Sequence, residues 1–265
     1  MTNESRDLNS WFETPVGRML VGKERAAIGG LLARLSGVHL LQIGSYGDGA
    51  ELPVPGATRQ WVVSTAGGPG VSLKAEPYNL PVCSDSVDVV VLVHALEFSP
   101  APHTVLRESA RVLAPEGRLL IVAFNPFSFW GLRRAAAGLR QPPAPWRGHF
   151  YAARRLRDWC TLLDLEPLPG RTLFFRPPLP RAAFLRRLEW FERFGDRWLR
   201  WFGGVHVMVS RKRVARVIPM GGLRVRPLPA LGRGMAWRRH ARVDGPAASS
   251  SARSLAAERM RGESE

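Results

Sequence analysis

A glycine-rich turn directly after an apolar run is the first candidate for binding chemistry. The run begins at His39 and reads HLLQIG, and the turn SYGDG follows it, with glycines at Gly44, Gly47 and Gly49. Glycine lets the backbone bend tightly and approach a ligand without a Cβ in the way. Many α/β proteins present backbone to a nucleotide-like ligand in this way. The stretch is therefore a candidate cofactor turn, and the alternative is an ordinary strand-to-loop connection.

His94 and Glu97 form a second candidate group, since a histidine and a carboxylate three residues apart can handle protons together. Neutral histidine is a suitable base near pH 7. Two interpretations stay open for the pair. Either His94 acts as a base together with Glu97, or Glu97 is only a structural carboxylate and His94 is not a base.

The elements that must position these residues are clearest in the middle of the chain. Residues 86–96 are a nearly continuous β-branched run, which is typical of a parallel strand covered on both faces. Residues 102–117 have a helical apolar face that Pro115 and Gly117 end, and residues 117–126 are a second buried strand. This spacing predicts a βαβ unit with a right-handed crossover in a parallel sheet.

Further elements are predicted on both sides of this unit. We expect helices at 16–36, 129–140 and 151–165, and strands at 38–44, 60–65, 71–76, 169–178 and 203–214. The last two strands follow each other at the end of the sheet, which indicates an antiparallel pair. Residues 181–202 form a predicted helix rich in aromatic and arginine residues. It either packs on its own domain as a lid over a substrate pocket or lies on an anionic membrane.

Composition and charge bound the class of protein. A chain of 265 residues with 45% apolar residues can bury a substantial core. The formal net charge of +16 is uneven: residues 1–127 carry −2, residues 128–218 carry +13 and residues 219–265 carry +5. Such basicity favours contact with RNA or an anionic membrane. The alternative is the arginine bias of a GC-rich bacterial genome, since 35 of the 38 basic residues are arginine.

The setting expected from the sequence is the cytoplasm. Cys83 and Cys160 are far apart and have no CxxC partner, so neither a disulfide framework nor a structural metal site is expected. We see no signal peptide and no apolar run near the ~20 residues that a membrane span needs.

Residues 80–126 carry a resemblance to a known family. In order they contain Leu80-Pro81, Asp85, Val87-Asp88, His94 with Glu97, Arg107-Glu108 with Arg111-Val112-Leu113, and Pro115-Glu116-Gly117. This succession is similar to the class I S-adenosylmethionine-dependent methyltransferases, specifically the type-11 subgroup. A looser similarity runs from about residue 38 to residue 214.

The resemblance implies an α/β fold, a Rossmann-like three-layer sandwich around a mostly parallel seven-stranded sheet with a reversed last strand. It also implies S-adenosyl-L-methionine as the cofactor, bound at the carboxyl ends of the first strands. The expected domains are a helical lead-in at 1–37, a methyltransferase-like domain at 38–218 with the insertion 181–202, and a basic, disordered tail at 219–265.

Site residues follow from the same resemblance. Backbone contact is expected from Gly44 to Gly47, ribose contact from Thr65, adenine contact from Glu76, and pocket lining from His94. A methyl transfer mainly needs positioning, so His94 is a candidate catalytic residue only as an alternative. The expected cofactor-binding set is Gly44, Ser45, Tyr46, Gly47, Thr65, Glu76, Leu80 and His94, with no metal ligand.

The first half of the sequence departs from the family pattern. Gln42 and Ser64-Thr65 stand where the family has carboxylates, and Tyr46 stands where its second glycine belongs. A tyrosine at positive φ would be strained, so the turn must differ in shape. Only residues 50–60 separate the first two strands, fewer than a parallel crossover usually needs, so the helix between them must be short or absent.

The sequence therefore predicts an S-adenosylmethionine-dependent methyltransferase acting on an unidentified small molecule. The alternative is a non-catalytic methyltransferase-like module that binds RNA or an anionic membrane through its basic second half. A third interpretation is a peripheral membrane enzyme acting on a lipid or quinone-like substrate.

Overall fold

The computed structural model describes residues 2–33, 35, 38–46, 51–54, 56–137, 144–178 and 201–213. These residues belong to one compact unit that spans residues 1–216. Predictions for Gly47 and Gly49, for residues 181–200 and for the tail at 219–265 lie outside the described residues.

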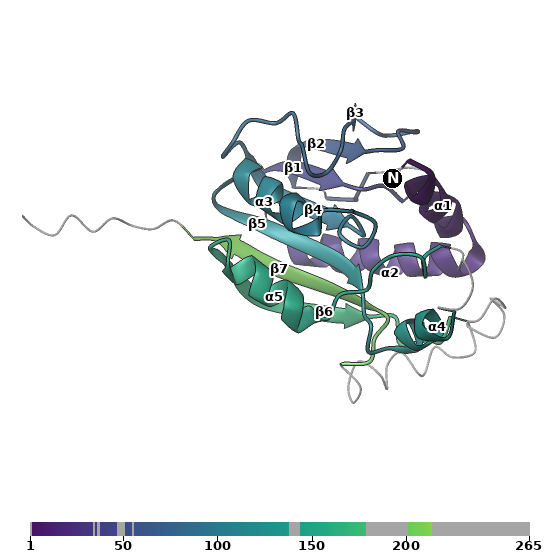
Figure 1. Ribbon diagram of the computed structural model, residues 1–265. Coiled ribbons are helices and arrows are strands. Elements are labelled where there is room, and N and C mark those ends of the chain that lie inside the picture. The colour runs from purple at the N-terminus through teal and green to yellow at the C-terminus, as the bar shows by residue number, and fades with distance from the viewer. Residues whose placement is uncertain are drawn as a thin grey trace, which may run out of the picture. The chain divides into compact units, whose positions relative to one another are not determined.

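The described strands form one seven-stranded sheet in the order β3-β2-β1-β4-β5-β7-β6 (Figure 1). Strands β1 to β5 pair in parallel, and β7 runs antiparallel to both β5 and β6. The predicted mostly parallel sheet with a reversed last strand is therefore confirmed. The strands are β1 (Val38–Ile43), β2 (Ala57–Ser64), β3 (Leu73–Lys74), β4 (Val87–Val93), β5 (Leu113–Phe124), β6 (Leu165–Leu173) and β7 (Val205–Lys212).

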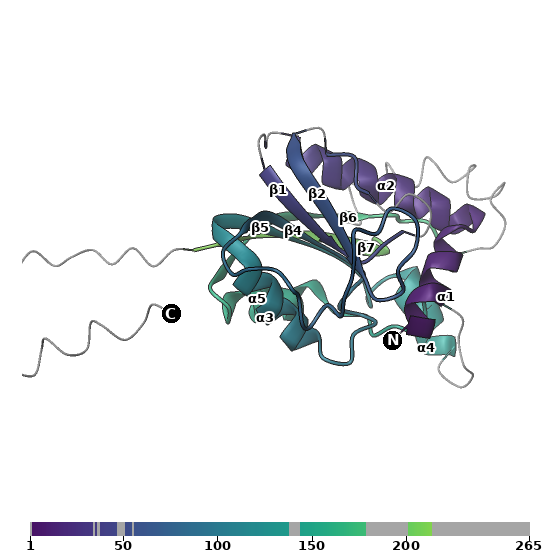
Figure 2. The same ribbon diagram turned by 90° about the horizontal axis from the view of Figure 1, so that it is seen from above.

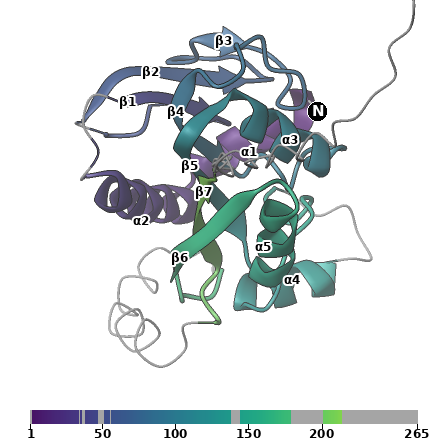
Figure 3. The same cartoon turned by 90° about the vertical axis from the view of Figure 1, so that its left-hand side faces the viewer.

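Helices cover both faces of this sheet, which makes three layers. In Figures 2 and 3 α2 lies on one face, whereas α3 and α5 lie on the other. Helix α1 lies beside the edge at which the parallel strands end (Figure 2). The described helices are α1 (Thr2–Phe12), α2 (Pro15–Leu32), α3 (Pro102–Val112), α4 (Phe129–Ala137) and α5 (Ala153–Thr161). Among them, none combines the length and apolar character that crossing a bilayer requires.

Residues 89–93 of strand β4 are all apolar because both faces of the strand are covered there. Val89, Val91 and Val93 belong to the hydrophobic cluster on the α2 side, whereas Val90 and Leu92 belong to the cluster on the α3 and α5 side. Successive side chains of a strand point to opposite faces. Residues 89–93 are therefore buried on both faces and apolar, as the sequence predicts, whereas Asp88 near the start of the strand is only partly buried.

Helix boundaries are where the predictions are least accurate. The helix expected at 102–117 ends at Val112, because Leu113 is already extended and Pro115 and Gly117 lie inside β5. Strand β6 begins at Leu165, inside the range expected for a helix. Helix α1 has no counterpart among the individual elements predicted above.

The connection between β1 and β2 confirms one departure from the family pattern. Its described residues, 44–46, 51–54 and 56, contain no helix. Helix α2 covers this face instead: Leu20 and Ile28 share a buried cluster with Leu40 of β1 and Leu52 of the connection. Thr14 caps α2 by accepting a hydrogen bond from the backbone N–H of Gly17 at 3.1 Å. A helix that precedes β1 thus shields the face that a crossover helix would otherwise cover.

Candidate functional site

The candidate site lies where the sheet changes winding direction, between β1 and β4. Open α/β sheets bind ligands at the carboxyl ends of the strands beside such a switch point. Gly44 and Ser45 follow β1, His94 follows β4, and all three line a cavity of about 40 Å³ together with Thr65 at the end of β2. Four of the predicted site residues are therefore brought together.

Gly44 is required by the shape of the turn after β1. Its φ is +95°, and a Cβ at this position would lie 2.3 Å from the carbonyl oxygen of Val93. Its N–H also donates to the carbonyl of Val63 at 2.8 Å. The turn is thus held against both neighbouring strands, and a side chain here would force β1 and β4 apart.

Gln42 has a structural reason to replace a carboxylate. Its side chain is fully buried, and its amide donates to the carbonyl of Gly44 at 2.9 Å. A carboxylate has no hydrogen to donate and would face that carbonyl oxygen with its own oxygens. Gln42 therefore stabilises the backbone conformation of the turn.

Tyr46 belongs to the hydrophobic core. Only 1% of it is exposed, its ring packs edge-on against Phe12 at 5.3 Å, and the Arg25 guanidinium lies 5.4 Å from the ring centroid. Burial, together with the nearby Glu24 carboxylate, raises the pKa of the Tyr46 hydroxyl well above its usual value. Tyr46 is absent from the positive-φ residues, so the turn has the altered shape that the sequence predicts.

His94 lies between two buried carboxylates. Its Nε2 is 3.1 Å from Oε1 of Glu24 on α2, and its Nδ1 is 3.0 Å from Oε1 of Glu97. All three side chains have no exposed surface. The imidazole also stacks on Phe124 at a centroid distance of 4.2 Å, and the N–H of Phe124 donates to Oε1 of Glu97 at 2.8 Å.

The electrostatics of this cluster decide the protonation of His94. Burial lowers its pKa, but the carboxylates of Glu24 and Glu97 outweigh that effect and raise the pKa to about 10. Both ring nitrogens lie within hydrogen-bond distance of carboxyl oxygens, and an imidazolium can donate to both. At neutral pH His94 is an imidazolium with no lone pair to accept a proton. The alternative interpretation of His94 as a base is therefore not favoured by its surroundings.

The predicted ribose and adenine residues lie on the β2 side of the cavity. Ser64 and Thr65 are both nearly buried and line it. Glu76 is not among the lining residues, but its neighbour Pro77 is. The buried Oε2 of Glu76 has no hydrogen-bond partner among the described residues. A buried carboxylate oxygen without a donor is a place where a ligand N–H can bind.

The backbone of Leu80 is held by hydrogen bonds to Glu108 and Arg111 of α3. Its N–H donates to Oε2 of Glu108 at 3.2 Å, and its carbonyl accepts from Arg111 at 3.0 Å. Arg111 also binds Glu108 through two nitrogens, at 2.9 and 2.8 Å, and the carbonyl of Val82 at 2.9 Å. The hydrogen bonds of Arg111 lower the pKa of Glu108. The Arg-Glu-x-x-Arg motif that carries the resemblance therefore fixes the loop before β4.

Helix α1 closes the cavity. Leu8 and Asn9 line it, and the Asn9 amide donates to Oγ of Ser45 at 2.8 Å. Asp7 forms an ion pair with Arg147 at 2.7 Å. Sites for small molecules usually have about 300–1,000 Å³, so about 40 Å³ is too small for a nucleoside. In this conformation α1 occupies the space beside the turn.

Two residues of the site were missed by sequence reasoning, namely Glu24 and Asn9. Glu24 had a visible signal, because it interrupts the apolar face that Leu20 and Ile28 form at helical spacing on α2. A charge on the buried side of a helix usually has a buried partner. Asn9 had no such signal within the polar first residues.

A family model described as a methyltransferase domain matches residues 57–121, from β2 into β5. A solved S-adenosylmethionine-dependent methyltransferase of Thermotoga maritima is 18% identical with a TM-score of 0.53, covering 72% of this chain and 88% of that chain. The YcgJ protein of Bacillus subtilis is 16% identical with a TM-score of 0.50, covering 72% and 98%. The chain has the class I methyltransferase fold. The resemblance read from residues 80–126 is thereby confirmed.

One curated relative is also similar to this chain. It is the uncharacterized protein YafS of Escherichia coli strain K12, which is 35% identical over 158 residues. The similarity covers 60% of this chain, and the chain spans about 65% of the length of that relative.

Within the described residues of this methyltransferase fold, no group of three or more His, Cys, Asp or Glu residues is arranged to hold a metal ion.

Proposed function

We propose that this protein is an S-adenosylmethionine-dependent methyltransferase that acts on a small molecule. The observation that carries the proposal is the close glycine turn at Gly44, placed at the switch point of a sheet whose residues 57–121 match a methyltransferase domain. The cofactor would supply an electrophilic methyl group on a sulfonium.

The polar groups beside the turn suit such a cofactor. The hydroxyl of Thr65 would bind the ribose, the free Oε2 of Glu76 would accept from the adenine amino group, and the backbone at Gly44 and Ser45 would face the remainder. Leu80 would help to line the adenine side. The cofactor fits into this site only after α1 moves away from Ser45, because Leu8 and Asn9 now fill the space.

The buried cluster sets a condition on the acceptor. The carboxyl groups of Glu24 and Glu97 lie on either side of the His94 imidazole, and none of the three side chains is exposed. Because His94 is already protonated at neutral pH, it does not remove a proton from the acceptor. The acceptor is therefore a group that is nucleophilic without a histidine base.

The first prediction tests cofactor binding by calorimetric titration with S-adenosylmethionine. The wild-type protein should bind it, and Thr65→Val should weaken binding by about tenfold, because a hydrogen bond to a buried group is lost without a change in side-chain size. Thr161→Val is the matched control, since Thr161 is exposed on α5 and should leave the affinity unchanged. A folded wild-type sample that releases no heat at high-micromolar cofactor would refute the proposal.

The alternative is a non-catalytic module, and the small size of the cavity favours it. In that case the basic second half of the chain would bind RNA or an anionic membrane. Its experiment is sedimentation with anionic vesicles, and separately with single-stranded RNA, at low and high salt. Salt-sensitive binding of either one by a protein that does not bind S-adenosylmethionine would support the alternative. The peripheral-enzyme interpretation needs both vesicle binding and cofactor binding.

A further inference from the structure

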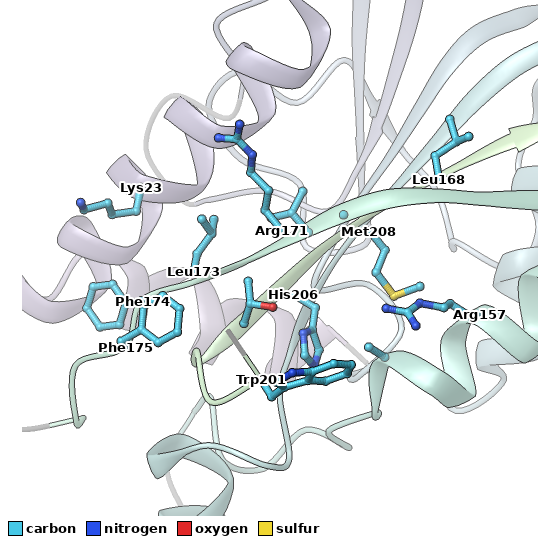
Figure 4. Close-up of a pocket in the computed structure, with 14 residues that line it drawn as sticks. Lys23, Arg157, Leu168, Arg171, Leu173, Phe174, Phe175, Trp201, His206 and Met208 are labelled. Carbon is cyan, nitrogen blue, oxygen red and sulfur yellow. The ribbon is translucent and has the colours of Figure 1, made fainter. Parts of the chain in front are cut away.

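A second, much larger cavity opens at the other end of the sheet. Its volume is about 660 Å³, and residues of β6, β7 and α5 line it. Figure 4 shows Arg157, His206 and Trp201 on one side of β6. Nothing in the proposed methyl-transfer site uses these residues.

The charge of this cavity is positive. Lys23, Arg157 and Arg171 line it, and no aspartate or glutamate is present among its described lining residues. Arg157 is exposed on α5, at a position from which its guanidinium acts on His206. Three cations without an acid among the described lining residues attract an anion.

His206 gives the lining of the cavity a buried polar group. Only 7% of it is exposed, and its Nε2 has no hydrogen-bond partner among the described residues. Burial and the charge of Arg157 lower its pKa to about 4. At neutral pH the ring is uncharged and keeps one N–H donor, and a buried donor or acceptor without a partner is costly unless a ligand or water binds it.

Trp201 supplies a flat apolar surface at the mouth of the cavity. It is 76% exposed, which is unusual for a residue of this size. Its backbone is nevertheless held in place, because the amide of Asn125 donates to the carbonyls of Trp201 at 2.7 Å and of Gly203 at 2.9 Å. An exposed indole on an anchored backbone offers a stacking surface to a planar group.

From this combination we propose that the cavity binds a small organic anion with a planar apolar body, such as an aromatic phosphate monoester or carboxylate. Arg157 pairs with the anionic group, the imidazole of His206 hydrogen-bonds to it, and Trp201 stacks on the planar part. Lys23 and Arg171 add attraction from the other side of β6.

This site is separate from the cofactor crevice. Three strand spacings lie between the β1–β4 junction and the β7–β6 junction, which is about 14 Å at the usual spacing of neighbouring strands. A methyl transfer needs its reacting atoms about 3–3.5 Å apart. An anion bound beside His206 is therefore not itself the reacting group, and the inference does not depend on the proposed methyltransferase activity.

The test is a titration of the full chain with phenyl phosphate in the absence of cofactor. Calorimetry measures the affinity, and NMR spectra record the imidazole signals. We expect binding that is tighter than that of inorganic phosphate, and no binding of benzyl alcohol. Phenylacetate as a second probe distinguishes a phosphate ligand from a carboxylate ligand. The imidazole signal that is missing in His206→Gln should shift on binding.

Matched variants decide which residues carry the binding. Arg157→Ala should weaken phenyl phosphate binding by about tenfold, because a charge-assisted hydrogen bond is lost. Arg154→Ala, on the same helix and also exposed, should change it less than about twofold. Trp201→Ala should weaken phenyl phosphate but not inorganic phosphate. No binding of phenyl phosphate or phenylacetate at millimolar concentration, or equal losses in the two arginine variants, would overturn the proposal.

Discussion

At the scale of single residues, His94 shows how surroundings override residue type. A histidine and a glutamate three positions apart are compatible with a base, and nothing in their spacing reveals a second carboxylate from α2. The third member, Glu24, lies 70 residues away in the sequence. Residue types could be predicted to meet at this edge of the sheet, but the protonation state could not, because it depends on a packing contact between distant elements.

The pairing of His94 has a consequence for stability as a function of pH. The pKa of its imidazole is 6.5 when unperturbed and about 10 in the folded protein. Below about pH 6.5 both states bind the proton and the pairing contributes fully. Between these values only the folded state binds it, so the free energy of unfolding should fall as pH rises, by at most about 1.4 kcal/mol per pH unit.

Urea unfolding between pH 6.5 and pH 10 measures this slope. His94→Gln should flatten it, whereas His149→Gln, an exposed histidine, should keep it. An NMR titration of the His94 ring in the wild-type protein reports its pKa directly. A ring that loses its proton near pH 6.5 would contradict the charge assignment of the cluster.

At the scale of elements, the central βαβ unit could be predicted and α1 could not. The runs at 86–96 and 117–126 are apolar on both faces, so they fit only buried strands. Residues 2–12 are mostly polar; Leu8 and Phe12 are buried in the core, and Trp11 is partly buried against it. These apolar residues, at positions 8, 11 and 12, cover barely one helical turn, which is too short a pattern to predict a helix that packs over the site.

The position of helix α1 over the cavity leads to a prediction about the affinity for S-adenosylmethionine. Leu8→Ala removes a side chain that fills the cavity, so it should strengthen binding of S-adenosylmethionine while it lowers the free energy of unfolding by about 2–4 kcal/mol. Leu20→Ala is the control, since Leu20 is equally buried in the same cluster but does not line the cavity. It should reduce stability alone. Calorimetry and urea unfolding of both variants give the comparison, and equal affinities in the two variants would rule out α1 as the obstacle.

At the scale of the whole molecule, charge and chemistry are divided between two ends of one sheet. The proposed cofactor crevice lies at β1 and β4, beside the buried cluster of Glu24, His94 and Glu97. The second cavity lies at β6 and β7, where arginine and lysine predominate. The net charges of the first 127 residues and of residues 128–218 already differ in the sequence. The sequence therefore indicates the uneven distribution of charge. It does not predict the cavity, because its lining depends on which side chains the edge strand leaves uncovered.

The position of α2 before β1 has a consequence for how the chain is made. Residues 15–32 leave the ribosome before any of the strands they cover. A further 70 residues must be synthesised after Glu24 before His94, its partner in the folded protein, is present. Contacts between distant parts of a chain form slowly, because a long loop must close first. Until the first four strands have emerged, this helix presents an apolar stripe with a charge in its middle. A charge within the stripe opposes its burial against other apolar surfaces before folding, and the finished domain then encloses Glu24 beside His94.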